Sequence, residues 1–268
     1  MILHESDNKT WIILIHGLGV SEKVWFEPLE EKVLFISFRT LLKNEKEIIP
    51  FAERIKGRYN IASWTQDEKS TIDEAAGGLK EIISSLPLKD FIIIAHSRGG
   101  LVARRAIQLY NLAPKALICL STPHYGSRFA DIVMRYSRFI SLAIPSIKRF
   151  LVPIVELCTD SHVIREINSS ENTQLEKHIP HFDIYGNNVT YIKKGPLDII
   201  GSLEKISGKN TPHEWRQGYG DGFVSVGSSV SPVTPRENSY CLPVNHLNIL
   251  IDNSMWDIVL SILTRFRQ

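Results

Sequence analysis

The chain has 268 residues, of which 43% are hydrophobic and 22% are charged. This apolar fraction excludes a disordered or collagen-like chain, and the length suits one large domain or two small ones. Lysine and arginine number 31 against 29 aspartates and glutamates, so the formal net charge is +2. A balance this close to neutral provides no overall attraction to nucleic acid, and we expect no nucleic-acid partner.

The N-terminus and the cysteines indicate the compartment. Residues 1–7 are too polar for a signal peptide, and prolines and basic residues interrupt the longest apolar stretch, at 139–158. The three cysteines lie far apart and show no Cys-x-x-Cys spacing, so we expect neither a disulfide nor a structural zinc site. These features predict a cytoplasmic protein.

Apolar runs rich in β-branched residues alternate with helical patterns along the chain. Residues 11–15 form such a run and end in a glycine-bearing loop, which is typical of a buried parallel strand. We expect further strands at 33–38, 59–64, 91–95, 116–120 and 182–185, and helices at 48–55, 71–86, 100–110 and 253–266. The alternation predicts right-handed βαβ units and a parallel sheet covered on both faces, so the fold class is α/β.

The pattern changes after residue 127. Residues 129–178 are helical, apolar and basic together. A basic amphipathic helix can lie in a membrane interface, so one hypothesis is peripheral membrane contact through 129–150. The alternative is the solvated face of a packed helix, and flotation with anionic liposomes distinguishes the two. The sequence does not determine the oligomeric state.

Residues 94–100, Ile-Ala-His-Ser-Arg-Gly-Gly, stand where the strongest predicted strand meets a helix. They match the small-x-Ser-x-Gly nucleophile elbow, with Ala95 where glycine is usual. In such an elbow a tight turn lifts the serine hydroxyl clear of the sheet, so the residues two before and two after it must be small. Ser97 is therefore the candidate nucleophile. The alternative is a serine in an ordinary strand-to-helix turn.

A serine hydroxyl is a weak nucleophile and needs a base and an acid that orients the base. In proteins with this elbow the acid follows the serine and the histidine comes last. His246, in a late loop before the final helix, is the candidate base, and His213 is the second choice. Asp221 is the candidate acid because glycines on both sides let the backbone turn sharply; Asp183 and Asp198 are rivals, and a Gly-Asp-Gly turn without chemistry is the alternative.

The oxyanion hole of such a site uses two backbone N–H groups. One belongs to Arg98, directly after the nucleophile, and the other is expected in the loop after the first strand, at Leu18. Because these are backbone groups, the side chains of Leu18 and Arg98 matter less than the shape of the loop.

Five motifs, taken in order, resemble bacterial triacylglycerol lipases of the α/β-hydrolase fold and the related GPI-inositol deacylase and lecithin–cholesterol acyltransferase-like branches. They occupy residues 16–19, 95–100, 121–127, 220–224 and 245–247. The resemblance implies one domain over residues 1–268, with a mostly parallel central sheet, helices on both faces, and 129–178 as a helical lid or cap. The alternative for 129–178 is helices that pack on the body. The resemblance also implies the same catalytic and oxyanion residues.

The motifs also suggest which residues surround the substrate. We expect contacts from His16, Gly17, His96, His124 and Tyr125. A structural role is the alternative for His124. We expect no cofactor and no obligatory metal, because the position where some of these lipases carry a calcium-binding aspartate holds an asparagine here, two residues after the candidate base.

Together these features predict a serine hydrolase that cleaves a small-molecule acyl ester or a lipid through an acyl-enzyme. An acyltransferase or a thioesterase with the same triad is the alternative, because the acyl-enzyme is common to all three. A third interpretation of the same motifs is a binding protein that has this fold but no catalytic activity.

Overall fold

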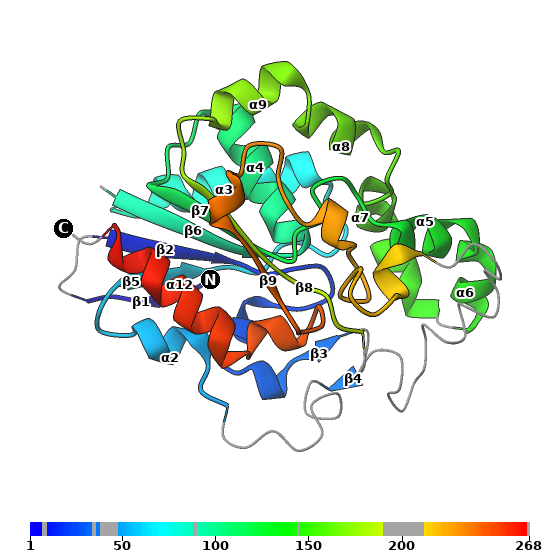
Figure 1. The fold of residues 1–268 in the computed structure, drawn as a ribbon, viewed down its shortest axis with the longest axis horizontal. Coiled ribbons are helices and arrows are strands. Elements are labelled where there is room, and N and C mark those ends of the chain that lie inside the picture. The colour runs from blue at the N-terminus through cyan, green and yellow to red at the C-terminus, as the bar shows by residue number, and fades with distance from the viewer. Residues whose placement is uncertain are drawn as a thin grey trace.

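The computed structural model describes residues 1–6, 10–33, 36–37, 48–87, 90–143, 145–189 and 212–266. A seven-stranded sheet crosses the middle of the molecule in the order β1-β5-β2-β6-β7-β8-β9 (Figure 1). The strands are β1 (Ile2–His4), β5 (Asn60–Ser63), β2 (Thr10–Ile15), β6 (Asp90–His96), β7 (Ala116–Leu120), β8 (His181–Gly186) and β9 (Ser239–Leu242). Every neighbouring pair is parallel except β1 with β5.

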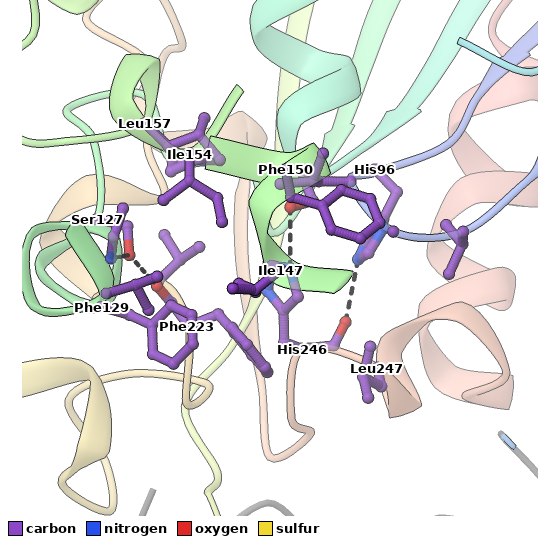
Figure 2. Close-up of a pocket in the computed structure, with 18 residues that line it drawn as sticks. His96, Ser127, Phe129, Ile147, Phe150, Ile154, Leu157, Phe223, His246 and Leu247 are labelled. Carbon is purple, nitrogen blue, oxygen red and sulfur yellow. Dashed lines mark hydrogen bonds between the residues drawn. The ribbon is translucent and has the colours of Figure 1, made fainter. Parts of the chain in front are cut away.

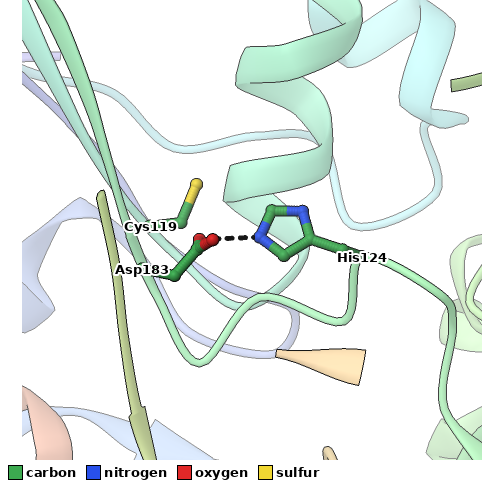
Figure 3. A group of neighbouring side chains, drawn as sticks. All are labelled: Cys119, His124 and Asp183. Carbon is green, nitrogen blue, oxygen red and sulfur yellow. Dashed lines mark hydrogen bonds and ion pairs between the residues drawn. The ribbon is translucent and has the colours of Figure 1, made fainter. Parts of the chain in front are cut away.

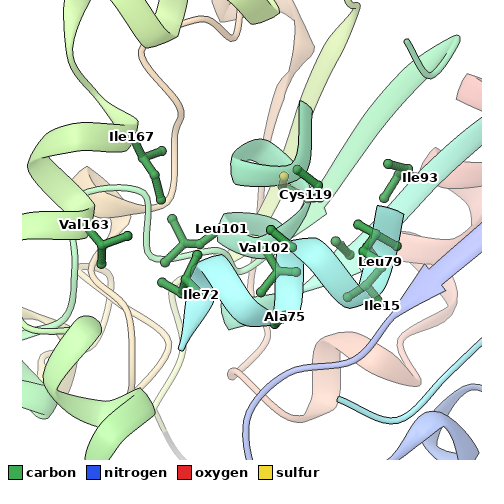
Figure 4. Packing of buried hydrophobic residues seen from close by; sticks show 14 of the residues in the cluster. Ile15, Ile72, Ala75, Leu79, Ile93, Leu101, Val102, Cys119, Val163 and Ile167 are labelled. Carbon is green, nitrogen blue, oxygen red and sulfur yellow. The ribbon is translucent and has the colours of Figure 1, made fainter. Parts of the chain in front are cut away.

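Helices cover both faces of this sheet. Helices α3 (Ile72–Ser85) and α4 (Arg98–Tyr110) pack on one face, and α2 (Phe51–Ile55) and α12 (Asn253–Thr264) pack on the other. Because side chains alternate along a strand, Ile15 and Ile93 join the cluster under α3 and α4 (Figure 4), whereas Ile12 and Ile92 join the opposite cluster. This arrangement confirms the predicted α/β class.

Most of the predicted elements are present, with shifted ends. Helix α3 begins where expected, since Thr71 Oγ1 accepts the N–H of Glu74 at 3.1 Å and a Glu74 carboxylate oxygen accepts the N–H of Thr71 at 2.7 Å. The prediction of one strand at 33–38 is wrong over the residues described there. Instead β3 (Lys32–Val33) and β4 (Ile36–Ser37) pair antiparallel with each other, outside the main sheet.

Short helices occupy most of the segment from 128 to 176. They are α5 (Arg128–Arg135), α6 (Ser137–Ala143), the 3₁₀ helix η3 (Pro145–Phe150), α7 (Leu151–Glu156), α8 (His162–Ile167) and α9 (Ser170–Glu176). Helices α8 and α9 lie over α4, whereas α5 and α6 lie at the right of Figure 1.

The exposed side chains of the first part of this segment, residues 128–150, include apolar and basic ones. Leu142 is 82% exposed, and Arg138 and Lys148 are exposed as well. The hypothesis of membrane contact through 129–150 depends on this surface. Among the residues that the structure describes, no helix combines the length and the apolar character that crossing a bilayer requires.

Candidate active site

Ser97 lies in the turn between β6 and α4. Its backbone has φ 54° and ψ −127°, a conformation that costs a non-glycine residue free energy, and its N–H donates to Leu120 O at 2.8 Å. A Cβ on Gly99 would lie 2.7 Å from His16 O, and Ala95 is buried between the two neighbouring strands. Small residues at both positions therefore permit the turn.

Three side chains from distant parts of the chain form a continuous hydrogen-bonded chain. Ser97 Oγ lies 3.0 Å from His246 Nε2, and His246 Nδ1 lies 2.8 Å from Asp221 Oδ2. The other carboxylate oxygen, Asp221 Oδ1, accepts the N–H groups of Phe223 at 3.0 Å and Val224 at 2.8 Å. The carboxylate accepts from Nδ1–H, so Nε2 is left free to accept the proton of the serine hydroxyl.

The rival residues are not part of this hydrogen-bonded chain of side chains. Asp183 accepts from His124 Nε2 at 2.9 Å and from the N–H of Ser231 at 2.8 Å. His213 is exposed and lies beside Tyr219, with 6.1 Å between the ring centres. Asp198 lies outside the described residues.

His96 supports the loop that carries His246. Its Nε2–H donates to the carbonyl oxygen of His246 at 3.0 Å (Figure 2), and the two ring centres are 4.8 Å apart. Burial, and then the neighbouring His246, hold the pKa of His96 well below its ordinary value, so the ring is neutral. A Cβ on Gly17 would lie 2.8 Å from His96 Nδ1, so only glycine allows the loop to approach so closely.

A second buried histidine, His16, shapes the loop expected to form the oxyanion hole. Its Nε2 accepts the N–H of Gln66 at 2.9 Å, so the proton is on Nδ1, which donates to Gly17 O at 2.7 Å. Burial lowers the pKa of His16 to about 4, which keeps the ring neutral. The Arg98 guanidinium donates to Gln66 Oε1 at 2.6 Å, and Gln66 Nε2 donates to His16 O at 2.6 Å. The Arg98 side chain therefore supports, through Gln66, the loop that runs from His16 to Leu18.

A cavity of about 110 Å³ opens beside the serine. Its polar residues are His96, Ser97, Ser127 and His246. Apolar side chains line the rest (Figure 2): Phe129, Ala130 and Val133 of α5, Ile147 and Phe150 of η3, Ile154 of α7, and Leu18, Val20, Pro123, Leu157, Phe223, Val224 and Leu247. A ligand in this cavity would therefore meet the Ser97 side chain and a mostly apolar wall.

Four of the five residues expected to contact substrate lie outside the lining of this cavity. His16 and Gly17 form the loop described above, and Tyr125 is 43% exposed on the surface. His124 is buried and lies between Asp183 and the Arg104 guanidinium, which approaches His124 Nδ1 to 3.3 Å. Only His96 lines the cavity, because the His16 and His124 rings face protein partners and Tyr125 faces the surface.

Cys119, His124 and Asp183 form a cluster whose donor atoms lie within 4.8 Å of one another (Figure 3). Burial, and then the charge of Asp183, raise the pKa of the Cys119 thiol well above its ordinary value, which opposes the thiolate that a metal needs. The Arg104 guanidinium already faces this group. A cationic neighbour and a protonated thiol do not fit a metal centre.

The sequence analysis missed Glu214 and Gln66. Gln66 bonds to His16 through both its backbone and its side chain, and Glu214 is buried beside the loop of Asp221. Neither residue belongs to a motif. Gln66 is 50 residues from His16, and Glu214 is 85 residues from Phe129, so no local pattern indicates these contacts.

The sheet order, the serine turn and the hydrogen-bonded triad define a protein of the α/β-hydrolase fold. In comparison with known families, residues 66–142 match the PGAP1-like alpha/beta domain, and this match includes the serine turn. The resemblance found in the motifs is therefore confirmed.

Solved structures share the fold over almost the whole chain. The mature form of Bacillus licheniformis lipase BlEst2 superposes with a TM-score of 0.64 at 17% identity, covering 97% of this chain and 94% of the lipase. Phospholipase PlaB from Legionella pneumophila has a TM-score of 0.53 at 18% identity, covering 82% and 44%. Epoxide hydrolase 1 of Caenorhabditis elegans is 27% identical over 135 residues, half of this chain, and the match spans 30% of that relative's length.

Proposed function

We propose that this protein is a serine hydrolase of carboxylic esters that acts through an acyl-enzyme. The observation that carries the proposal is the hydrogen-bonded chain Ser97–His246–Asp221 at the end of an apolar cavity. A serine aligned with a neutral imidazole is an activated nucleophile, and the buried carboxylate stabilises the imidazolium that forms.

The steps follow from the hydrogen bonds. Ser97 Oγ attacks the ester carbonyl while its proton passes to His246 Nε2. The backbone N–H groups of Leu18 and Arg98 stabilise the oxyanion, each by about 3 kcal/mol in the transition state. His246 then gives the proton to the leaving alcohol, and a water molecule releases the acid from Ser97 by the same two transfers.

The cavity supports an apolar acyl group, so the proposed substrate is a small-molecule acyl ester or a lipid. Helix α5, η3 and α7 supply much of the lining, which supports residues 129–178 as the lid or cap of a single domain. An acyltransferase or a thioesterase would use the same acyl-enzyme. Product analysis with an acceptor alcohol, and with a thioester as donor, separates these activities from hydrolysis.

The first test measures initial rates on p-nitrophenyl esters from acetate to palmitate. We expect Ser97→Ala to lower kcat by at least about 1,000-fold, because nucleophile and base act as one unit. Ser63→Ala is the matched control, since Ser63 is a buried serine whose hydroxyl donates to Leu14 O at 3.0 Å and which does not line the cavity. A Ser97→Ala variant that retains more than about a thousandth of the wild-type rate contradicts the assignment.

A further inference from the structure

A buried carboxylate that the proposed reaction does not use lies beside the loop of Asp221. Glu214, in the 3₁₀ helix η5 (His213–Trp215), is 1% exposed. Its Oε1 accepts the N–H of Phe129 at 2.9 Å, and Oε2 has no hydrogen-bond partner among the described residues. Burial raises the pKa of Glu214, so holding a carboxylate here has a free-energy cost that other contacts must offset.

The partner of this carboxylate is the first turn of α5. Helix α5 forms a wall of the cavity through Phe129, Ala130 and Val133. The first turn of a helix carries unpaired N–H groups and a partial positive charge, so a carboxylate there is a strong, directional attachment. Ser127 adds a second attachment, because its hydroxyl donates to Phe223 O at 2.6 Å.

The backbone of Glu214 is joined to the loop that carries the catalytic acid. Gly222 N–H donates to Glu214 O at 2.9 Å. A Cβ on Gly220 would lie only 2.3 Å from Glu214 Cα, so the two segments are in close contact. Gly220 and Gly222 flank Asp221. One residue therefore holds the cavity wall with its side chain and the acid loop with its backbone.

Apolar contacts also pack α5 against the loop of Asp221 and against η5. The Phe129 ring lies 4.7 Å from the Phe223 ring and 6.4 Å from the Trp215 ring, between centres, and Trp215 packs with Ile132. Such packing is less directional than a hydrogen bond. The hydrogen bond from the N–H of Phe129 to Glu214 therefore adds a directional contact that helps to fix α5 against these rings.

We propose that Glu214 is a positioning residue that sets the place of α5 relative to Asp221 and thereby determines which acyl chains are cleaved efficiently. This inference rests on the proposed ester hydrolysis. Without the carboxylate, the N–H of Phe129 loses its partner and the wall shifts. A long acyl chain packs along Phe129 and Val133, so its binding weakens when this wall shifts. An acetyl group reaches little beyond Ser97 and is affected less.

The experiment compares kcat/KM for p-nitrophenyl octanoate and acetate in Glu214→Ala, Glu214→Gln and wild type. We expect the octanoate-to-acetate ratio to fall at least about tenfold in Glu214→Ala, since a displacement near 1 Å has effects of this size. Glu214→Gln keeps an oxygen acceptor and stays within about twofold of wild type. The control is Glu74→Ala, which removes a carboxylate from the first turn of α3, away from the cavity, and leaves the ratio unchanged.

Hydrogen exchange of residues 128–135 provides a readout that does not depend on turnover. Exchange rises in Glu214→Ala and stays at the wild-type level in Glu214→Gln and Glu74→Ala. If wild type cleaves no ester, the proposed hydrolysis fails, whereas unchanged exchange in Glu214→Ala overturns the positioning role itself. An unchanged ratio in an active Glu214→Ala enzyme overturns the specificity role. If Glu214→Ala does not fold, Glu214→Asp replaces it. The aspartate side chain is shorter by one methylene, so its carboxylate lies farther from the N–H of Phe129, and the octanoate-to-acetate ratio must fall.

Discussion

Three buried histidines surround Ser97, and their hydrogen-bond partners determine three different roles. His246 has a carboxylate on Nδ1 and the serine on Nε2, which is the arrangement of a general base. His96 donates to a carbonyl of the base loop, and His16 accepts from Gln66. The residue type is the same at all three positions, so the hydrogen-bond partners of the two ring nitrogens distinguish the three histidines.

The role of Asp221 is tested by Asp221→Asn. The variant keeps an oxygen that accepts the N–H groups of Phe223 and Val224, but its amide nitrogen then faces His246 Nδ1 and favours the wrong tautomer. We expect kcat on p-nitrophenyl butyrate to fall by about 1,000- to 10,000-fold with little change in stability.

The matched control is Asp252→Asn, at the start of α12, where the side chain caps the helix at Met255 N and does not line the cavity. This variant should retain wild-type turnover. A loss of less than tenfold in Asp221→Asn would assign the orienting role to another group.

Sequence motifs predicted the positions of Ser97, His246 and Asp221 in the chain, and the structure brings these three together. The expected substrate contacts of His16 and His124 were not predictable in the same way. The ring of His16 is oriented by a residue 50 positions away, and that of His124 by a residue 59 positions away. A motif specifies which residue is present, whereas long-range partners decide where its ring points.

At the scale of elements, a buried ion pair connects α4 to α9. Arg104 Nη2 lies 2.6 Å from Glu176 Oε1, and both side chains are fully buried. The guanidinium also donates to Asn168 Oδ1 and to Ile167 O, and Gln108 donates to Glu176. Helix α4 begins at the serine turn, so this network attaches the segment 162–176 to the helix that follows Ser97.

We expect Glu176→Ala to lower the free energy of unfolding by about 3–5 kcal/mol, because it leaves the Arg104 charge buried without its anion. Urea unfolding measures this difference. The double variant Arg104→Met, Glu176→Leu should lose less than Glu176→Ala, since apolar groups of similar volume remove both charges. If the single variant loses under 1 kcal/mol, the pair does not hold α9.

Elements with local signals were predictable and elements without them were not. Helix α3 carries a capping box within its own first turn, and β6 is a continuous apolar run. The edge strands β1 and β9 were missed, because β1 has three residues and β9 is only partly buried, so neither shows an apolar run. Their pairing depends on strands β5 and β8, which lie far away in the sequence.

At the scale of the whole molecule, the sheet separates two apolar cores, and polar groups buried beside them link stability to pH. Burial lowers the pKa of both His16 and His181 from 6.5 to about 4. Unfolded chains therefore bind protons at these sites before the folded protein does. The stabilisation is complete above pH 6.5, decreases as the pH falls from 6.5 to about 4, and changes no further below that.

We predict that protonation of each of these two histidines in the unfolded chain lowers the free energy of unfolding by about 3 kcal/mol as the pH falls from 6.5 to about 4. His181→Gln has no proton to gain, so it should flatten the dependence on pH measured by urea unfolding. His162→Gln, at a position whose side chain is largely exposed, is the control and should leave the slope unchanged. Equal slopes in wild type and His181→Gln would contradict the assignment.

The sequence by itself determined the α/β class, the order of most strands and helices, and the chain positions of the serine, aspartate and histidine. These properties depend on local patterns: apolar runs, caps and small residues around a tight turn. Only the tertiary structure decided that His16 and His124 face protein partners, that α5 forms a cavity wall, and that Glu214 joins this wall to the loop of Asp221. Such contacts join residues 50 to 85 positions apart, and burial and hydrogen-bond partners at that range arise from packing of the whole chain.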